Sequence, residues 1–441
     1  MPADYVDTFS LDRKLVTLAR SHRGFLRALR AGTAEEHAFD FTARPATAAL
    51  VRDLGETAAV DPLAKPLQRW MYRLYEERAL ADFSIALARS WYLDTHELDR
   101  PVRGSFTLSA LRRSMLAERG EQRVAFFDAL RDRGSKAIER FLRLSERRAE
   151  LAANAGLPSL LAFERPNETV PEAASRLLDA TRDALATLHL ETLPELLETA
   201  LGRQTTARFP SRLTPRALAE LLDARGLTET MELSADELPA ALGSSSFLVG
   251  LDRMGAAIRA AHVNRALPFA TTHEPYVLPE RTYGSLFALL ALNPVFAERR
   301  LDVDKSRRRE HVRGIGAVLL LRARMLALRV RLAGELSRSL GGFSRAYPEE
   351  TYRALGVEVS ERAAGLLFTP RPGDDARLAG LLLALSLEAE LVDTHDEDWF
   401  RNPRAIEELR ERARLPIETE PNTDALARGE KRLVERLSEW L

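Results

Sequence analysis

The sequence feature that most constrains the fold is a helical periodicity that runs through almost all of the 441 residues. Apolar residues recur three or four positions apart from the first segment, Asp7 to Ala31, to the last, which begins near Thr423. This spacing places them on one face of an α-helix, whereas a half-buried strand needs strict alternation. Continuous alternating runs joined by hairpin turns are absent from the sequence. The pattern therefore predicts an all-α protein.

A few segments are expected to depart from regular helix. A long helix is predicted from Pro66 to Leu93, followed by a short extended segment from Pro101 to Thr107. Thr230 to Leu233 is the other extended candidate, and the runs Gly243–Ser246 and Gly341–Gly342 are predicted hinges. We expect one continuous domain made of an N-terminal helical segment at 1–60, a helical lobe at 61–242 and a second lobe at 243–441.

Composition excludes several classes of protein. The chain has no cysteine, so disulfides, thiolate nucleophiles and Cys-ligated zinc are ruled out. Its formal net charge of −1 gives no overall field that attracts nucleic acid or an anionic membrane. The start has no basic block followed by an apolar one, so no signal peptide is expected. The most apolar run, Ile315 to Leu321, is too short to span a bilayer. We expect a cytoplasmic protein without nucleic-acid or membrane partners, and the abundance of Arg, Ala and Leu is typical of a GC-rich bacterial genome.

The segment from Ser246 to Leu292 predicts a helix, a loop and a second helix. Within the first helix, the run LDRMGAAIR resembles the zinc helix of the thimet oligopeptidase and oligoendopeptidase family of metallopeptidases. The family motif is His-Glu-x-x-His, in which two imidazoles hold zinc and the glutamate is the general base. Asp252 stands at the first histidine, Arg253 at the glutamate and Ala256 at the second histidine. The chain thus keeps the frame of the motif without its chemical groups.

The resemblance extends over residues 60–441. The run RTYGSLF is similar to the family's second helix, which implies that the third zinc-ligand position falls on Arg281, or on Glu280 if the register shifts by one. Tyr347 and Tyr352 are similar in position to the tyrosine-bearing loop that reaches the substrate in active relatives. The resemblance implies two helical lobes around a cleft whose floor carries the Asp252 helix. Its candidate cleft residues are Glu280, Ser285, Tyr347, Tyr352, His262, His273 and Glu274.

The replaced residues cannot perform zinc chemistry. Zinc in these enzymes needs three protein ligands, and Ala256 offers no donor atom. An arginine at position 253 cannot accept a proton at neutral pH, and its charge would repel a dication. We therefore expect no metal and no cofactor, and we predict that Asp252, Arg253 and Arg281 form an ion-paired cluster where zinc would lie.

Three classes of function follow. The favoured hypothesis is a non-catalytic metallopeptidase homologue, or pseudopeptidase, that binds a peptide or a partner protein, including an active peptidase relative that it would regulate. The rival class is a hydrolase with a non-standard site around His262, His273 and Glu274. The third is a structural interaction module whose cleft is filled by side chains.

Overall fold

The computed structural model describes residues 6–34, 44–99, 102–158, 169–202, 209–223, 225–239, 241, 243–273, 278–360, 368–416 and 421–441. Helices dominate this part of the chain, as predicted. The first half of the described elements comprises α1 (Thr8–Ala31), α3 (Ala48–Thr57), α4 (Ala64–Ala79), α5 (Ala81–Tyr92), β1 (Thr95–Leu98), β2 (Gly104–Thr107), α6 (Leu108–Ala117), α7 (Gly120–Arg133), α8 (Ser135–Asn154), α9 (Thr169–Ala180), α10 (Arg182–Ala186), α11 (Leu193–Leu201), α12 (Pro215–Leu222) and α13 (Arg225–Thr228).

The remaining described elements are η1 (Ala235–Glu237), α14 (Ser244–Ala261), α15 (Phe269–Thr272), α16 (Leu278–Leu289), η2 (Leu290–Leu292), α17 (Pro294–Arg300), α18 (Arg308–Arg338), α19 (Leu340–Leu355), α20 (Asp374–His395), η4 (Trp399–Arg401), α21 (Pro403–Arg414) and α22 (Thr423–Trp440). Among the described residues, no helix is both long and apolar enough to cross a membrane.

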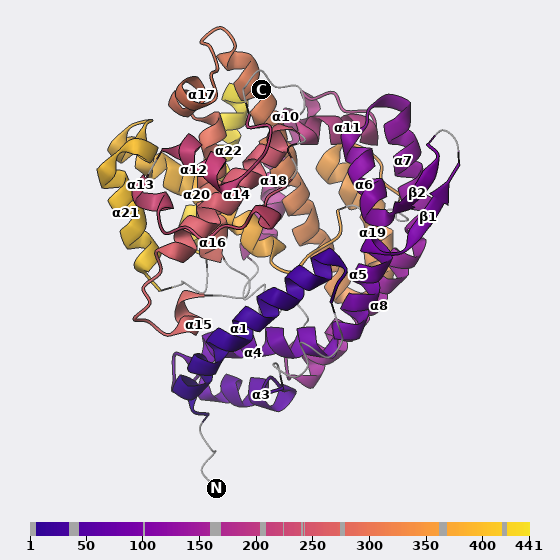
Figure 1. The fold of residues 1–441 in the computed structure, drawn as a ribbon, viewed down its shortest axis with the longest axis vertical. Coiled ribbons are helices and arrows are strands. Elements are labelled where there is room, and N and C mark those ends of the chain that lie inside the picture. Colours follow the sequence, from indigo (N-terminus) through magenta and orange to yellow (C-terminus); the bar gives the residue numbers. More distant parts are fainter. Residues whose placement is uncertain are drawn as a thin grey trace.

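The N-terminal helices form a layer with a core of its own. Helix α1 crosses α4, and α3 packs against α4 and lies below α4 in Figure 1. Helices α5 to α8 rise along one side of the molecule (Figure 1). The face of α1 that carries Leu11, Leu15 and Leu18 packs into this core, where Leu15, Val51 and Met71 have no exposed surface. The periodicity of α1 therefore decides which face meets the layer.

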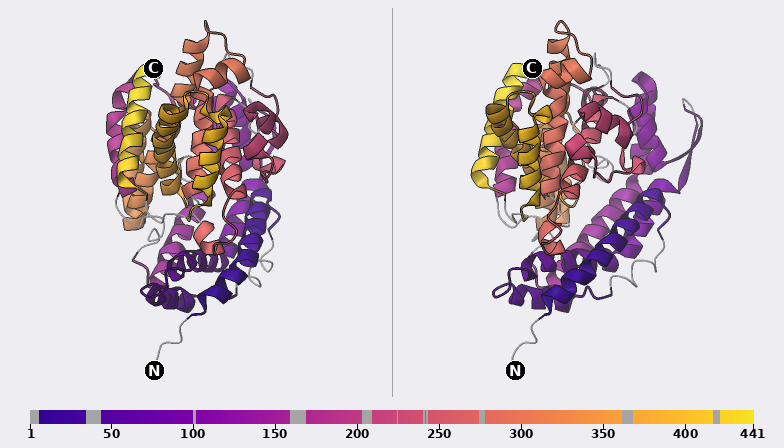
Figure 2. Two further views of the ribbon diagram at one scale, coloured as in Figure 1. Left: turned by 90° about the vertical axis from the view of Figure 1, so that its left-hand side faces the viewer. Right: turned by 60° about the vertical axis from the view of Figure 1, so that its left-hand side comes forward.

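The C-terminal half is a bundle of long helices. Helix α14 packs on α16, α16 on α20, and α20 on α22, while α18 lies against α9, α19 and α20; these helices stand side by side in Figure 2. Glycines bring α14 and α16 close together. A Cβ atom on Gly255 would lie 2.4 Å from the carbonyl oxygen of Tyr283, and one on Gly284 would lie 2.6 Å from the carbonyl oxygen of Asp252. Larger residues at either position would push the helices apart.

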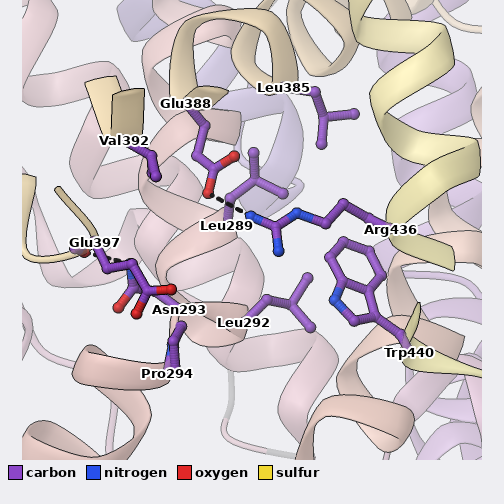
Figure 3. A pocket seen from close by; sticks show the side chains of 10 residues that line it. All are labelled: Leu289, Leu292, Asn293, Pro294, Leu385, Glu388, Val392, Glu397, Arg436 and Trp440. Carbon is purple, nitrogen blue, oxygen red and sulfur yellow. Dashed lines mark hydrogen bonds and ion pairs between the residues drawn. The ribbon is translucent and has the colours of Figure 1, made fainter. Parts of the chain in front are cut away.

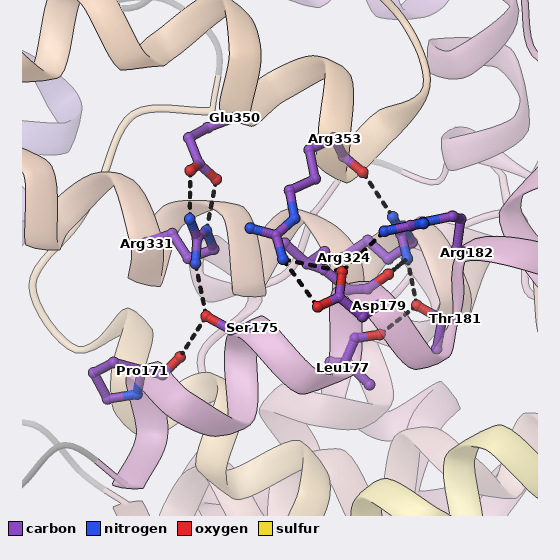
Figure 4. Close-up of polar contacts among 11 residues, drawn as sticks. Pro171, Ser175, Leu177, Asp179, Thr181, Arg182, Arg324, Arg331, Glu350 and Arg353 are labelled. Carbon is purple, nitrogen blue, oxygen red and sulfur yellow. Dashed lines mark hydrogen bonds and ion pairs between the residues drawn. The ribbon is translucent and has the colours of Figure 1, made fainter.

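A buried arginine joins three helices of this bundle. Arg324 of α18 is 1% exposed. Its guanidinium donates to the carbonyl oxygens of Leu178 (2.7 Å) and Ala354 (2.6 Å). It also donates to the carbonyl oxygen of Arg353 (2.9 Å) and to the Thr181 hydroxyl (Figure 4). These acceptors lie at the C-terminal ends of α9 and α19, where helix carbonyls have no partner within their own helix. Arg324 thus satisfies two helix ends with one cation, which the helix dipoles also favour.

Several local predictions need correction. The predicted helix from Pro66 to Leu93 is two helices that meet at the buried residue Leu80. The extended segment near Thr107 is confirmed as β2, which pairs antiparallel with β1, but Thr230–Leu233 contains no strand. Pro101 lies outside the described residues. The division of the chain at residues 60 and 242 stays a prediction.

Candidate functional site

The residues that the sequence comparison sets at the zinc-ligand positions of the peptidase family include Asp252 and Arg281. In the structure their side chains belong to a charged cluster between three helices. Asp252 of α14 is 6% exposed. One of its carboxylate oxygens lies 3.9 Å from a guanidinium nitrogen of Arg281 on α16, and the other lies 3.3 Å from Arg322 on α18. The predicted ion pair between Asp252 and Arg281 is thus confirmed. Arg322 was not predicted, although an arginine that interrupts the apolar surface of a long helix is a signal of a buried partner.

Positive charge prevails around this carboxylate. Burial, followed by the charge of Arg377, lowers the pKa of Arg281 to about 10, although Asp252 acts in the opposite direction. Arg253 and Arg322 also lower the pKa of Arg281, so both contribute positive charge there. Ala256, one helical turn beyond Asp252, offers no ligand atom. One carboxylate among several guanidinium groups does not fit zinc, which needs three donor side chains and repels cations.

Glu280 points to a different partner from its neighbour Arg281. Its carboxylate lies 3.2 Å from Arg259 of α14, whose guanidinium also donates to the carbonyl oxygen of Thr272 at 2.8 Å. Arg259 is 2% exposed, and burial raises the pKa of Glu280 although Arg259 opposes the shift. Arg259 therefore ties the end of α14 to α16 and to the last residue of α15, which is a structural role.

The two histidines of the rival hydrolase site are engaged separately. The Nδ1 atom of His262 lies 2.8 Å from the carbonyl oxygen of Ile258, one turn back in α14. His273 stacks on Phe269 with ring centroids 4.2 Å apart, and its Nδ1 lies 3.0 Å from the Thr272 hydroxyl. Burial, followed by the charge of Arg259, lowers the pKa of His273 to about 4.

These histidines do not build a metal centre with described neighbours. Within the described ranges, no three His, Asp or Glu side chains come together in a way that would hold a metal ion. Glu274, the third residue of the rival site, lies outside the described residues.

The tyrosine loop implied by the family resemblance is a helix in this chain. Tyr347 and Tyr352 both belong to α19, which begins after Ser339, whose hydroxyl accepts a hydrogen bond from the Gly342 amide at 2.8 Å. Tyr347 is fully buried beside Phe343, whereas Tyr352 is 58% exposed. The prediction of a tyrosine-bearing loop, and of a hinge at Gly341–Gly342, is therefore wrong. Ser285 is buried between helices.

The chain does contain a cavity of ligand size, at a place that the sequence did not indicate. Its volume is about 490 Å³, within the usual range for small-molecule sites. It is enclosed by α1, α4, α5, α6, α8 and the segment at 369–372 that precedes α20. The lining combines apolar and aromatic side chains with four arginines and one glutamate, and it includes neither Tyr347 nor Tyr352.

A second pocket near the C-terminus is too small for a ligand. Its volume is about 20 Å³, room for roughly one water molecule. Glu388 of α20 points across it toward Arg436 of α22 at 3.5 Å, and the Asn293 amide donates to the carbonyl oxygen of Glu397 at 2.7 Å (Figure 3). These contacts hold helix ends together, so the larger cavity is the candidate binding site.

The fold is shared with solved peptidases. PZ peptidase A, solved with inhibitor 2, matches with a TM-score of 0.55 and 10% sequence identity over 98% of this chain and 98% of that chain. An oligoendopeptidase F from Bacillus anthracis strain Ames matches with a TM-score of 0.50 and 12% identity over 98% of this chain and 84% of that chain. Comparison with protein-family models gives no match, and comparison with curated protein sequences gives no significant one. At such low identity these likenesses establish the fold alone: a large helical oligoendopeptidase-like fold, as predicted.

Proposed function

We propose that this chain is a non-catalytic protein with a peptidase fold, which binds a peptide or a segment of a partner protein. The observation that carries the proposal is the ion-paired cluster of Asp252 with Arg281 and Arg322 at the position compared with the zinc site. A peptidase of this kind needs a metal to generate its nucleophile and a general base to accept its proton. The chain has cations in place of both.

The binding part of the proposal is supported by the cavity beside α4, α5 and α6. Peptide-sized ligands need a concave site with apolar walls and a few polar groups that fix orientation, and the cavity has both. The hydrolase alternative lacks comparable support, because His262 and His273 have separate partners.

The proposal can be tested by restoring the missing groups. The variant combines Asp252→His, Arg253→Glu, Ala256→His and Arg281→Glu. It places two imidazoles one turn apart on α14 and a carboxylate at position 281 of α16, the residue that now pairs with Asp252. We expect this variant to bind one zinc ion, whereas the natural chain with added zinc cleaves no quenched-fluorescence peptide from a mixed library. The matched control keeps Arg281 and changes only the three α14 residues, and it should bind zinc more weakly. Zinc-dependent cleavage by the natural chain would refute the proposal.

A further inference from the structure

The charged residues that line the large cavity fall into two groups. In the first group, Arg73 of α4 pairs with Glu77 and lies 3.2 Å from Glu76, while Arg148 of α8 lies 3.7 Å from Glu76. Although burial opposes it, the charge of Arg73 lowers the pKa of Glu77 to about 2. Two carboxylates thus balance two guanidinium groups, and this part of the wall has no surplus charge.

The second group has cations without matching anions. Arg112 of α6 and Arg371, in the segment before α20, both line the cavity. In the part of the chain that the structure describes, neither guanidinium forms a salt bridge or a hydrogen bond. The two groups are close, because burial and then the charge of Arg371 lower the pKa of Arg112 to about 10. Two like charges therefore face the same space.

A third arginine strengthens this positive field from α18. Burial, followed by the charge of Arg371, lowers the pKa of Arg329 to about 10, and its Nε atom is buried without a hydrogen-bond partner. The carboxylate of Asp374 accepts from the Arg371 backbone amide at 2.8 Å and from Arg377 at 2.7 Å. Its charge raises the pKa of Arg371 and of Arg329, but burial outweighs it in both groups, and the same carboxylate is also the partner of Arg377. One anion is thus shared among more guanidinium groups than it can balance.

Guanidinium groups at a cavity wall lower the stability of the fold when no anion balances their charge, and a bound anion removes this penalty. Arg112 is half-buried and Arg371 is exposed, and both line the cavity, so both can reach a ligand. Planar guanidinium groups bind carboxylate and phosphate oxygens in pairs of charge-assisted hydrogen bonds. The rest of the wall offers apolar and aromatic surface from Leu87, Trp91 and Phe141.

We propose that this cavity binds a small organic anion whose carboxylate or phosphate lies between Arg112 and Arg371 and whose apolar part packs against Trp91 and Phe141. This inference rests on the proposed function only in taking the cavity as the binding site. It adds that the ligand carries a carboxylate or a phosphate. It does not depend on the state of the Asp252 cluster.

The experiment uses the full chain and four probes: phenyl phosphate, phenylacetate, the neutral analogue phenylacetamide, and inorganic phosphate. Binding is measured by isothermal titration calorimetry and by the change in melting temperature. We expect at least one aromatic anion to bind at a ratio of 1:1, phenylacetamide to bind at least about tenfold more weakly, and inorganic phosphate to bind more weakly than phenyl phosphate. Tighter binding of phenyl phosphate or of phenylacetate tells which oxyanion the site prefers. Equal affinity for the neutral analogue, or no binding by any probe, would overturn the proposal.

Variants then locate the site. Arg112→Gln and Arg371→Gln should each weaken the anion by about tenfold or more, whereas Arg404→Gln, an exposed arginine at the start of α21, should leave binding unchanged. Without ligand, Arg371→Gln should melt at the same temperature as the natural chain or higher, because burial and the neighbouring arginines disfavour this cation more than Asp374 favours it. A purely structural role would instead lower the melting temperature. If Arg112→Gln fails to fold, Arg112→Lys keeps the charge and should still weaken binding by losing the planar pair of donors.

These outcomes separate the two proposals. Zinc-dependent peptidase activity together with intact anion binding would refute the non-catalytic function and leave the anion site standing. A zinc-free, inactive chain that binds no anion, or binds it equally well after both arginines are replaced, would refute the anion site alone.

Discussion

Removing the charge of Asp252 should destabilise the fold, because the carboxylate lies among cations between three helices. Two unit charges 3.3 Å apart, the distance to Arg322, attract by about 5 kcal/mol at an effective dielectric constant of about 20. The side chains of Arg281 and Arg322 are 16% and 26% exposed, so water can replace part of this attraction. We expect Asp252→Asn, which keeps the size of the side chain, to lower the free energy of unfolding by about 3 kcal/mol.

Urea unfolding followed by circular dichroism measures this loss. Asp393→Asn is the matched control, because Asp393 is an exposed residue of α20 and its loss should change the free energy by less than about 0.5 kcal/mol. A double-mutant cycle with Arg322→Met isolates the pair, and its coupling energy should be at least about 1 kcal/mol. If Asp252→Asn unfolds at the same urea concentration as the natural chain, the ion pairs do not hold α14 in place and the reasoning fails.

Three further predictions follow from the described contacts. Arg324→Met removes the donor shared by the ends of α9 and α19 and should lower the free energy of unfolding by about 3 kcal/mol, with faster amide exchange in those last turns; unchanged exchange would contradict the capping role. Gly255→Ala should cost about 1–3 kcal/mol through collision with the Tyr283 carbonyl, whereas Gly24→Ala, with open space around it in α1, should gain about 0.5–1 kcal/mol; equal melting temperatures would refute the close contact. The folded pKa of His273 is lowered from 6.5 to about 4, so the unfolded chain binds this proton more readily and stability falls as the pH drops through that interval. His273→Gln should flatten the fall in urea midpoint between pH 6.5 and 4, and an unaltered slope would show that another group causes it.

The fold class was predictable because helical periodicity is a local property of the sequence. The break at Leu80 was not, since no proline or glycine marks it and the residue is buried by distant helices. The hairpin was half missed: β2 fell within the predicted extended segment, whereas β1 was not predicted. Strands of four residues carry too little alternation to be recognised by it.

The candidate site was predictable only where a motif frame set the register. The comparison of α14 and α16 with a zinc helix and its ligand helix led to the pair of Asp252 with Arg281. The same comparison failed for Tyr347 and Tyr352, although the spacing of Phe343, Tyr347 and Thr351 already fits one buried helix face.

The cavity was beyond sequence reasoning altogether. Arg112 and Arg371 lie on elements that are far apart in the chain, and each is one arginine among many. They meet because α6 and the segment before α20 line the same cavity. No local pattern encodes such a juxtaposition, because it arises from tertiary packing alone.

Our main proposal is that cations lie where a peptidase of this fold would hold its metal. Its most direct test is the metal content of the full chain, purified without a histidine tag or chelator and then titrated with zinc. We predict no stoichiometric zinc in the purified protein and no tight zinc binding on titration. One tightly bound zinc ion per chain, lost when Asp252 is changed to asparagine, would contradict it.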